Sequence, residues 1–298
     1  MVSRSSAPTP HRKRRGRLWL IGAVTAGLVS AAVAGGVALA TDDPPSAASS
    51  TTEAPVRTLA SSPAEAPART LAFPEATGEQ AVAETQQVSG TFDGELQRFV
   101  GTGALGGGDQ EEGQDPIFEL ADGAVLKNVI LGAPAADGVH CLGSCTLDNV
   151  FWEDVGEDAA TFLGESEDAT YLVTGGGATK AEDKVFQFNG NGTLTVRGFE
   201  VSDFGKLART CGNCSEQFQR DIVLEDVTAT APGSELAGIN SNLGDTARLS
   251  NITIVGDAER EIVPCQKFEG VTEGEPTELG SDADGTNCVF AESDITFQ

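Results

Sequence analysis

Short runs of β-branched and aliphatic residues recur along the second two-thirds of the chain, and Gly, Asn or Asp closes each run. Six of them are AVLKNVILGAP, CTLDNVFWEDVG, ATYLVTGGG, GTLTVRGFEVSD, DIVLEDVTAT and ARLSNITIVGD. Such runs predict β-strands, and the closing residues predict turns. Helical periodicity is hard to find in this region, and Gly is too frequent for long helices. The pattern therefore predicts an all-β domain.

The runs recur at a nearly regular interval. One aliphatic or aromatic marker per run gives steps of 21, 24, 23, 29 and 26 residues, between Leu126, Leu147, Tyr171, Leu194, Val223 and Leu249. A period of ~20–30 residues, with one set of short strands per turn, indicates a stacked solenoid. Missing helices exclude helical solenoids, and a missing leucine pattern excludes leucine-rich repeats. We expect a parallel β-helix, with an antiparallel β-sandwich as the alternative.

Three of the runs carry an Asn shortly after the marker, at Asn128, Asn149 and Asn251. Asn tolerates the left-handed backbone conformation and can bond its own backbone, so it suits bends between strands. We therefore expect these residues at bends of the β-helix.

The N-terminal part of the chain has a different composition. A positive segment at residues 11–17 precedes an uncharged Ala/Gly/Val-rich stretch at residues 18–40, which ends in Ala-Leu-Ala. This pattern predicts a signal peptide cleaved before Thr41, although ~23 apolar residues can also form an uncleaved membrane anchor. Both a cleaved signal peptide and a membrane anchor imply that the rest of the chain is exported. We expect a signal or anchor at residues 1–40, a flexible disordered linker rich in Ala, Pro, Ser and Thr at 41–83, and the β-helix domain at 84–298.

The charge balance narrows the choice of partners. The chain has 298 residues, with 45 acidic and 19 basic side chains and a net charge of −26. Six of the basic residues precede Asp42, the first acidic residue, which leaves 13 basic against 45 acidic, or −32, after the signal region. Phosphate backbones and anionic lipids attract clustered Lys and Arg, so nucleic acid is excluded as a partner and anionic membrane surfaces are poor ones.

Six cysteines agree with an oxidising, extracellular compartment. They are Cys141, Cys145, Cys211, Cys214, Cys265 and Cys288. Six cysteines allow 15 pairings. The simplest scheme joins sequence neighbours, 141 with 145, 211 with 214 and 265 with 288. With only His11 and His140 in the chain, a zinc site at the Cys-Gly-Asn-Cys segment is disfavoured.

Acidic residues concentrate where two successive coils would meet. Asp137 and Glu157 are 20 residues apart, which is one coil period, so a solenoid would stack them. Converging carboxylates repel one another unless a cation lies among them, and hard oxygen ligands suit Ca²⁺. The alternative is that a very acidic protein simply has solvated acidic loops.

Basic residues are scarce but clustered. Five of the 13 fall within 30 positions: Lys180, Lys184, Arg197, Lys206 and Arg209. The step from Lys184 to Lys206 is 22 residues, again one coil, so these cations should stack beside the acidic cluster. A groove with a Ca²⁺ end and a Lys/Arg wall would fit a polyanionic substrate. The alternative is a set of ion pairs with the abundant Asp and Glu.

Four of these segments together carry a family resemblance. Residues 133–141 (APAADGVHC), 152–159 (WEDVGEDA), 183–187 (DKVFQ) and 205–209 (GKLAR) resemble those of the small secreted pectate lyases of polysaccharide lyase family 3 (pectate lyase class III), in order and in coil spacing. The resemblance runs from about residue 87 to the C-terminus. It implies a right-handed, single-stranded parallel β-helix. It also implies Ca²⁺-dependent β-elimination in (1→4)-α-D-galacturonan, which yields 4,5-unsaturated oligogalacturonates.

The resemblance implies roles for individual residues. The implied calcium ligands are Asp137, Glu157, Asp158 and Asp183, with Asp154 nearby as a further ligand. The implied catalytic residues are Lys184, the Brønsted base, with Lys206 and Arg209, which bind the substrate carboxylate. Glu112 corresponds to an acidic substrate-binding position at the start of the groove. Ala208 departs from the family's usual Val, an apolar change that leaves the chemistry intact.

The leading hypothesis is therefore a secreted pectate lyase, a carbon–oxygen lyase that acts on pectate or polygalacturonate with Ca²⁺ as cofactor. We expect an alkaline optimum, because a lysine base must act in its neutral form. We also expect a monomer without an obligate protein partner, secreted or tethered to the membrane by its N-terminal segment. The alternatives are a galacturonan hydrolase with paired carboxylates and a non-catalytic, Ca²⁺-dependent polysaccharide-binding β-helix.

Overall fold

The computed structural model describes residues 72–107 and 113–298. The expected signal segment, most of the expected linker and Glu112 lie outside these residues. Within the two described ranges, the chain forms no helix with the length and apolarity that crossing a membrane would require.

The described residues are almost entirely strands and turns. The strands are β1 (Glu79–Val82), β2 (Gln86–Val88), β3 (Thr91–Gly101), β4 (Phe118–Leu120), β5 (Ala124–Gly132), β6 (Val139–Cys141), β7 (Cys145–Trp152), β8 (Asp158–Phe162), β9 (Thr170–Thr174), β10 (Gly177–Phe188), β11 (Gly192–Arg197), β12 (Glu200–Thr210), β13 (Arg220–Glu225), β14 (Thr228–Asn240), β15 (Thr246–Ser250), β16 (Ile252–Val255), β17 (Val263–Glu269), β18 (Thr277–Gly280), β19 (Cys288–Val289) and β20 (Ile295–Phe297). Three short 3₁₀ turns accompany them, η1 (Gly103–Leu105), η2 (Ser241–Leu243) and η3 (Glu292–Asp294).

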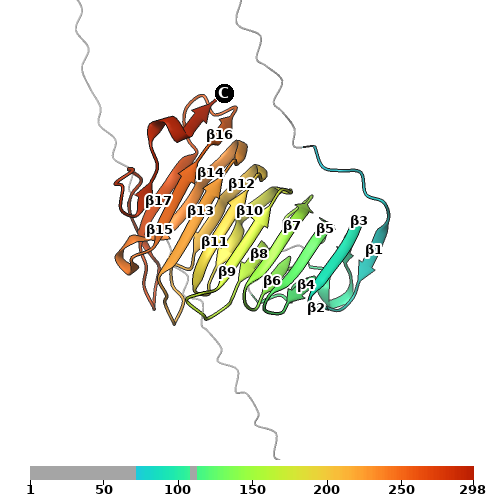
Figure 1. The fold of residues 1–298 in the computed structure, drawn as a ribbon. Helices are drawn as coiled ribbons and strands as arrows, with labels where there is room; N and C mark the ends of the chain where they lie inside the picture. The colour runs from blue at the N-terminus through green and yellow to red at the C-terminus, as the bar shows by residue number, and fades with distance from the viewer. Residues whose placement is uncertain (1–71, 108–112) are drawn as a thin grey trace, which may run out of the picture. The chain divides into compact units, whose positions relative to one another are not determined.

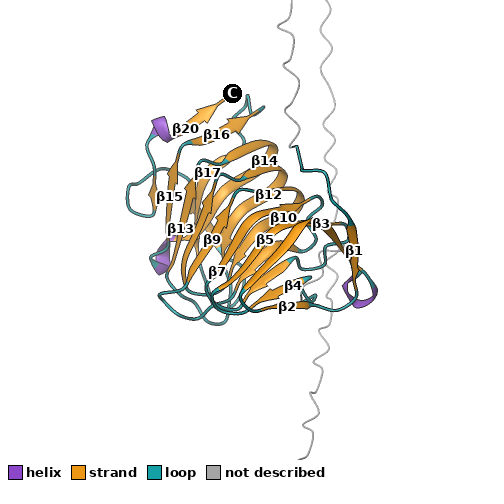
Figure 2. Cartoon of the chain, turned by 45° about the vertical axis from the view of Figure 1, so that its right-hand side comes forward, coloured by secondary structure: helices purple, strands orange, loops and turns teal. Residues whose placement is uncertain are grey.

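Strands of successive coils pair in parallel and build three ladders. The first ladder runs β1–β3–β5–β7–β10–β12–β14–β16–β20. The second runs β3–β5–β7–β9–β11–β13–β15–β19. The third runs β2–β4–β6–β8–β10–β12–β14–β17. Figures 1 and 2 show the resulting stack of coils, which confirms the predicted parallel β-helix and rules out the sandwich.

The bends from the second ladder to the first confirm the role expected for Asn. Asn128, Asn149 and Asn251 have φ values of 52°, 57° and 52°, in the left-handed region. Asn149 Nδ2 also donates a 2.8 Å hydrogen bond to Asn128 Oδ1 of the preceding coil. Gly175 and Gly198, each with φ 62°, occupy the same bend in two intervening coils. These five coils thus use a residue that tolerates this backbone conformation.

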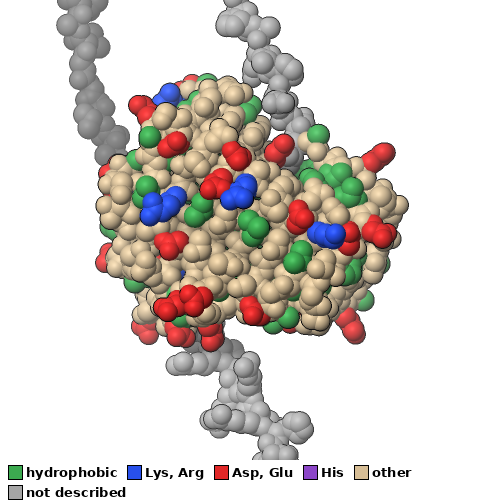
Figure 3. All heavy atoms as spheres, in the orientation of Figure 1, with side chains coloured by type: hydrophobic (Ala, Val, Ile, Leu, Met, Phe, Trp, Pro, Cys, Tyr) green, Lys and Arg blue, Asp and Glu red, His purple; other side chains and the backbone are tan. Residues whose placement is uncertain are grey.

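The interior of the solenoid is filled by apolar side chains that stack from coil to coil. Fully buried aromatic residues continue through its middle, with Trp152 against Phe186, Phe186 against Phe199, and Phe162 against Tyr171. Contacts of this kind add to the stabilisation from buried area. Acidic side chains are scattered over the face drawn in Figure 3, and basic ones are few.

The β-helix begins earlier than expected. Strand β1 pairs with β3, although it lies in the segment that we assigned to the linker, so residue 84 is not the start of the fold. The sequence of β1, Glu-Gln-Ala-Val, lacks the β-branched run that marks the other strands.

Three disulfides close local segments of the coils. They join Cys141 to Cys145, Cys211 to Cys214 and Cys265 to Cys288. The simplest pairing of sequence neighbours is therefore confirmed.

Candidate active site

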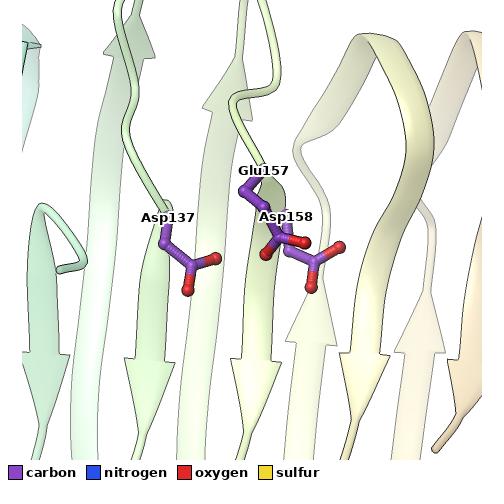
Figure 4. Close-up of side chains that lie close together, drawn as sticks. All are labelled: Asp137, Glu157 and Asp158. Atoms are coloured by element: carbon purple, nitrogen blue, oxygen red, sulfur yellow. The ribbon is translucent and has the colours of Figure 1, made fainter. Parts of the chain in front are cut away.

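The third ladder brings three carboxylates together. Asp158 is the first residue of β8, Glu157 precedes it, and Asp137 lies just before β6 in the preceding coil. Parallel pairing of β6 with β8 places the two segments side by side, and one oxygen from each carboxylate lies within 4.8 Å of the others (Figure 4). All three residues are buried, with exposures of 6%, 7% and 3% for Asp137, Glu157 and Asp158. We call this group the carboxylate triad.

The triad has the chemistry of a site for a hard cation. In the described part of the chain, Asp137 Oδ1 and Asp158 Oδ1 are buried without a hydrogen-bond partner. Burial raises the pKa of Asp158 to about 9, against the effect of Lys184 and with help from the neighbouring charges of Glu157 and Asp137. Buried carboxylates that converge in this way are stabilised when a cation lies among them. The residues therefore fit a Ca²⁺ ion.

Two lysines continue the same row away from the triad. Lys184 is the register partner of Asp158 on one side and of Lys206 on the other, which confirms the predicted stacking. Lys184 Nζ lies 3.5 Å from Asp158 Oδ1 and 3.8 Å from Glu157 Oε1. It also donates to Asp183 Oδ2 at 2.6 Å, and Lys206 Nζ donates to Asp183 Oδ1 at 2.7 Å.

The acidic partners decide the charge of Lys184. Burial by itself would lower the pKa of this lysine, but Asp158, Asp183 and Glu157 outweigh burial and raise the pKa above its ordinary value. Lys184 is therefore an ammonium in this arrangement.

Arg209 also lies on the third ladder, but its side chain is buried and not on the surface. It is the register partner of Gln187 and is 6% exposed. Its Nη1 donates to the backbone oxygen of Thr210 and, at 3.1 Å, to Asn240 Oδ1. The guanidinium carbon lies 4.0 Å from the ring centroid of Phe268. Burial lowers the pKa of Arg209 to about 10.

Several residues singled out in the sequence lie elsewhere. Lys180 pairs with Asp154 at 2.9 Å, and both are exposed, so neither joins the triad. Arg197 pairs with Glu225 at 2.7 Å on the second ladder. Lys180 and Arg197 therefore form simple ion pairs, which was the alternative interpretation. Of the five clustered cations, only Lys184, Lys206 and Arg209 lie on the third ladder, which carries the triad. Asp183 lies between the two lysines, outside the triad.

Sequence reasoning missed Glu235, Asn240 and Phe268. Glu235 on β14 is the register partner of Lys206 and is 7% exposed. The sequence held a signal for it, because the marker step at this coil is 29 residues and Glu235 follows Lys206 by that distance. Asn240 and Phe268 carried no such signal. His140 was noted only in the zinc argument, yet its Nε2 lies 2.8 Å from Asp137 Oδ2.

Comparison with known proteins identifies the family to which the chain is similar. A profile of the pectate lyase family matches residues 70–275. Probable pectate lyase D of Emericella nidulans is 44% identical over 213 residues, which cover 70% of this chain and 78% of that relative. Pectate lyase H of the same organism is 42% identical over 222 residues, which cover 74% and 83% of the two chains.

Solved structures give the same result. The catalytic domain of pectate lyase PelI from Erwinia chrysanthemi has a TM-score of 0.61 and 32% identity, and the match covers 72% of this chain and 100% of that one. PelI in complex with tetragalacturonic acid has a TM-score of 0.62 and 30% identity, with 73% and 70% covered. The resemblance seen in the sequence motifs is confirmed, and the chain belongs to the pectate lyase family.

Proposed function

We propose that this chain cleaves polygalacturonate by Ca²⁺-dependent β-elimination, with Lys184 as the base. The observation that carries the proposal is the row formed by the carboxylate triad, Lys184 and Lys206 in consecutive coils. A candidate cation site, a half-buried lysine and a second lysine thus follow one another along the third ladder. A polymer with one carboxylate per sugar suits such a row.

The reaction requires a base and positive charge. The base removes the proton on C5 of a galacturonate, α to its carboxylate. The electron pair forms the C4–C5 double bond, the C4–O4 bond breaks, and O4 leaves with its electrons and takes a proton from water. The C5 proton is very weakly acidic while the carboxylate keeps its full charge, so cations must offset that charge as it develops.

The residues divide these tasks. Lys206 and Arg209 supply cations for the substrate carboxylate, and Lys184 takes the C5 proton once it is neutral. Asp137, Glu157 and Asp158 would hold the Ca²⁺, which would supply further positive charge to offset the substrate carboxylate. Asp183 and Glu112 stay predictions, as a further calcium ligand and as a substrate-binding residue.

A galacturonan hydrolase fits the arrangement less well. Its acid and base must flank the scissile bond from two sides. Here the carboxylates converge on one point, and Lys184 lies against two of them. A non-catalytic binder would have no use for a lysine held this deeply.

Ultraviolet absorbance on polygalacturonate tests the proposal, because the 4,5-unsaturated product absorbs and a hydrolase product does not. We expect a rise with Ca²⁺ in the wild type, none with chelator, and none for Lys184→Ala. Lys180→Ala is the matched control, because Lys180 lies on the same strand but pairs with Asp154 at the surface. No rise in the wild type would refute the lyase, and a rise in Lys184→Ala would refute the base.

Membership of the pectate lyase family and the disulfides both support action outside the cell. Three disulfides are typical of proteins from oxidising compartments, which supports an extracellular enzyme. The monomeric state and the cleaved or uncleaved N-terminal segment stay predictions.

A further inference from the structure

Arg209 is held by contacts with Thr210, Gly238, Asn240 and Phe268, which we call the arginine cage. Nη1 donates to Asn240 Oδ1 and to the backbone oxygens of Thr210 and, at 3.5 Å, Gly238. Phe268 covers the guanidinium at 4.0 Å. In this position the guanidinium is tied at Nη1 and covered on one face, and because Arg209 is only 6% exposed it offers little surface to a ligand.

Glu235 lies nearby and, unlike Arg209, has a polar atom without a partner. In the described part of the chain, its Oε1 is buried without a hydrogen-bond partner. Burial raises the pKa of Glu235 to about 7, although Lys206 and Arg209 act to lower it. A buried carboxylate oxygen without a donor is costly unless a cation reaches it in some state of the protein.

Gly238 lies between the two side chains. A Cβ at this residue would lie 2.6 Å from Arg209 Cδ and 2.6 Å from Glu235 Oε1. Since both atoms lie that close to one point, they are no more than twice that distance apart. The stem of Arg209 thus already passes the carboxylate, and only its terminal torsions direct the guanidinium into the cage. Because Gly238 has no side chain, the arginine stem and the carboxylate can lie this close together.

We propose that Glu235 is a positioning residue for Arg209: when substrate binds, the guanidinium leaves Asn240, pairs with the Glu235 carboxylate and faces the galacturonate carboxylate beside Lys206. This inference rests on the proposed function, because the ligand is the uronate of that substrate. The planar fork of Arg carries five donors. One edge can stay bound to Glu235 while the other binds the substrate bidentately.

The register supports this second position. Glu235 is the direct partner of Lys206, so a guanidinium paired with it comes next to the lysine of the row. Lys206 itself is tied to Asp183 on its other side. Arg209 and Lys206, which both lie on β12, would then approach one substrate carboxylate together, which the cage prevents.

Two sets of substitutions shift the equilibrium between the two positions of Arg209 in opposite directions. Glu235→Gln keeps the shape and removes the charge that draws Arg209 out. Asn240→Ala removes an acceptor of the cage, and Phe268→Leu removes its aromatic face while keeping an apolar filler. A ligand that selects one state binds more tightly when the other state is weakened.

The experiment measures trigalacturonate binding by calorimetry in Lys184→Ala protein with saturating Ca²⁺, so that turnover does not interfere. We expect Glu235→Gln to weaken binding at least fivefold and Asn240→Ala or Phe268→Leu to tighten it at least twofold. Phe268→Leu serves if Asn240→Ala does not fold, as judged by thermal melting. Glu235→Asp should recover part of the lost affinity, which a merely structural carboxylate would not require.

The direction of each change in affinity decides whether the inference holds. If Glu235→Gln binds as tightly as its parent, or if both sets weaken binding alike, the two-position inference is wrong although the proposed function stands. If the wild type gives no ultraviolet rise with Ca²⁺ and the Lys184→Ala parent binds no trigalacturonate, the proposed function falls and takes this inference with it.

Discussion

Lys184 and Lys206 are register partners in neighbouring coils, and their ammonium groups donate to the two different oxygens of the Asp183 carboxylate. This one acid therefore keeps two like charges side by side. We expect Asp183→Asn to lower kcat/KM at least tenfold, because the neutral amide no longer offsets the repulsion between them. The ultraviolet assay on polygalacturonate measures the change.

The same variant tests whether Asp183 also binds calcium, as the family resemblance implied. We expect Asp183→Asn to lose less Ca²⁺ affinity than Glu157→Gln, because Glu157 belongs to the triad and Asp183 does not. Equal losses in calorimetric titrations would make Asp183 a ligand.

Lys184→Arg separates the charge of this residue from its proton transfer. Arginine keeps the positive charge but does not lose its proton in proteins. If Lys184 is the base, the variant should lose about 10²–10⁴-fold in kcat. Binding of trigalacturonate should change only a few-fold.

The pH profile gives an independent check on the base. Lysine ordinarily titrates near ~10.4 and the acids around Lys184 raise its pKa further, so the wild-type rate should rise with pH across the alkaline range. A maximum near pH 5 would contradict a lysine base and favour a carboxylate.

Calcium binding should show itself in stability as well as in activity. A ligand that binds only the folded state adds about 2.7 kcal/mol at a concentration 100 times its Kd. We expect Ca²⁺ to raise the melting temperature of the wild type and to leave that of Glu157→Gln nearly unchanged. Asp154→Asn is the matched control, because Asp154 is an exposed acid paired with Lys180. A calcium shift lost in Asp154→Asn and kept in Glu157→Gln would place the ion elsewhere.

The row at the site could be predicted because it follows the coil period. The 22-residue step from Lys184 to Lys206 and the 20-residue step from Asp137 to Glu157 each match one coil, and both pairs do meet. Proximity in the sequence misled us for Lys180 and Arg197. A stretch of 30 residues runs around more than one face of the coil, so neighbours in sequence point to different sides.

The burial of Arg209 could not be predicted from its own segment. Phe268, which covers it, lies two coils further along the third ladder. Glu235 was missed although it follows Lys206 by 29 residues, the marker step at this coil, because no charged motif surrounds it. Local motifs identify which side chains take part, whereas contacts between distant coils set their exposure and charge.

Glu235 should make stability depend on pH in a defined direction. Its pKa is raised from 4.5 to about 7 in the folded protein, so the folded state holds a proton that the unfolded state releases. The free energy of unfolding should therefore fall as pH rises from about 4.5 through about 7, by at most about 3 kcal/mol from this group.

Glu235→Gln removes this dependence. The charged groups acting on Glu235 are Lys206, Arg209, Glu278 and Asp183. All four are present in both proteins, so the difference between variant and wild type isolates Glu235. We expect the variant to gain stability relative to the wild type between pH 5 and pH 8, measured by urea unfolding with chelator present. A difference that is flat with pH would show that Glu235 is already ionised below this range.

The bend at Asn149 tests the local rule that shapes each coil. Its φ of 57° costs a residue with a Cβ about 1–2 kcal/mol unless its side chain compensates, and glycine avoids that cost. Asn149 compensates partly through its hydrogen bond to Asn128. We expect Asn149→Ala to lower the urea midpoint clearly, because it loses the bond and keeps the backbone strain. Asn149→Gly should lower it less, because only the bond is lost, as the natural glycines at the same bend indicate. If both variants lower the midpoint equally, the hydrogen bond between coils, and not the backbone conformation, determines why Asn is used there.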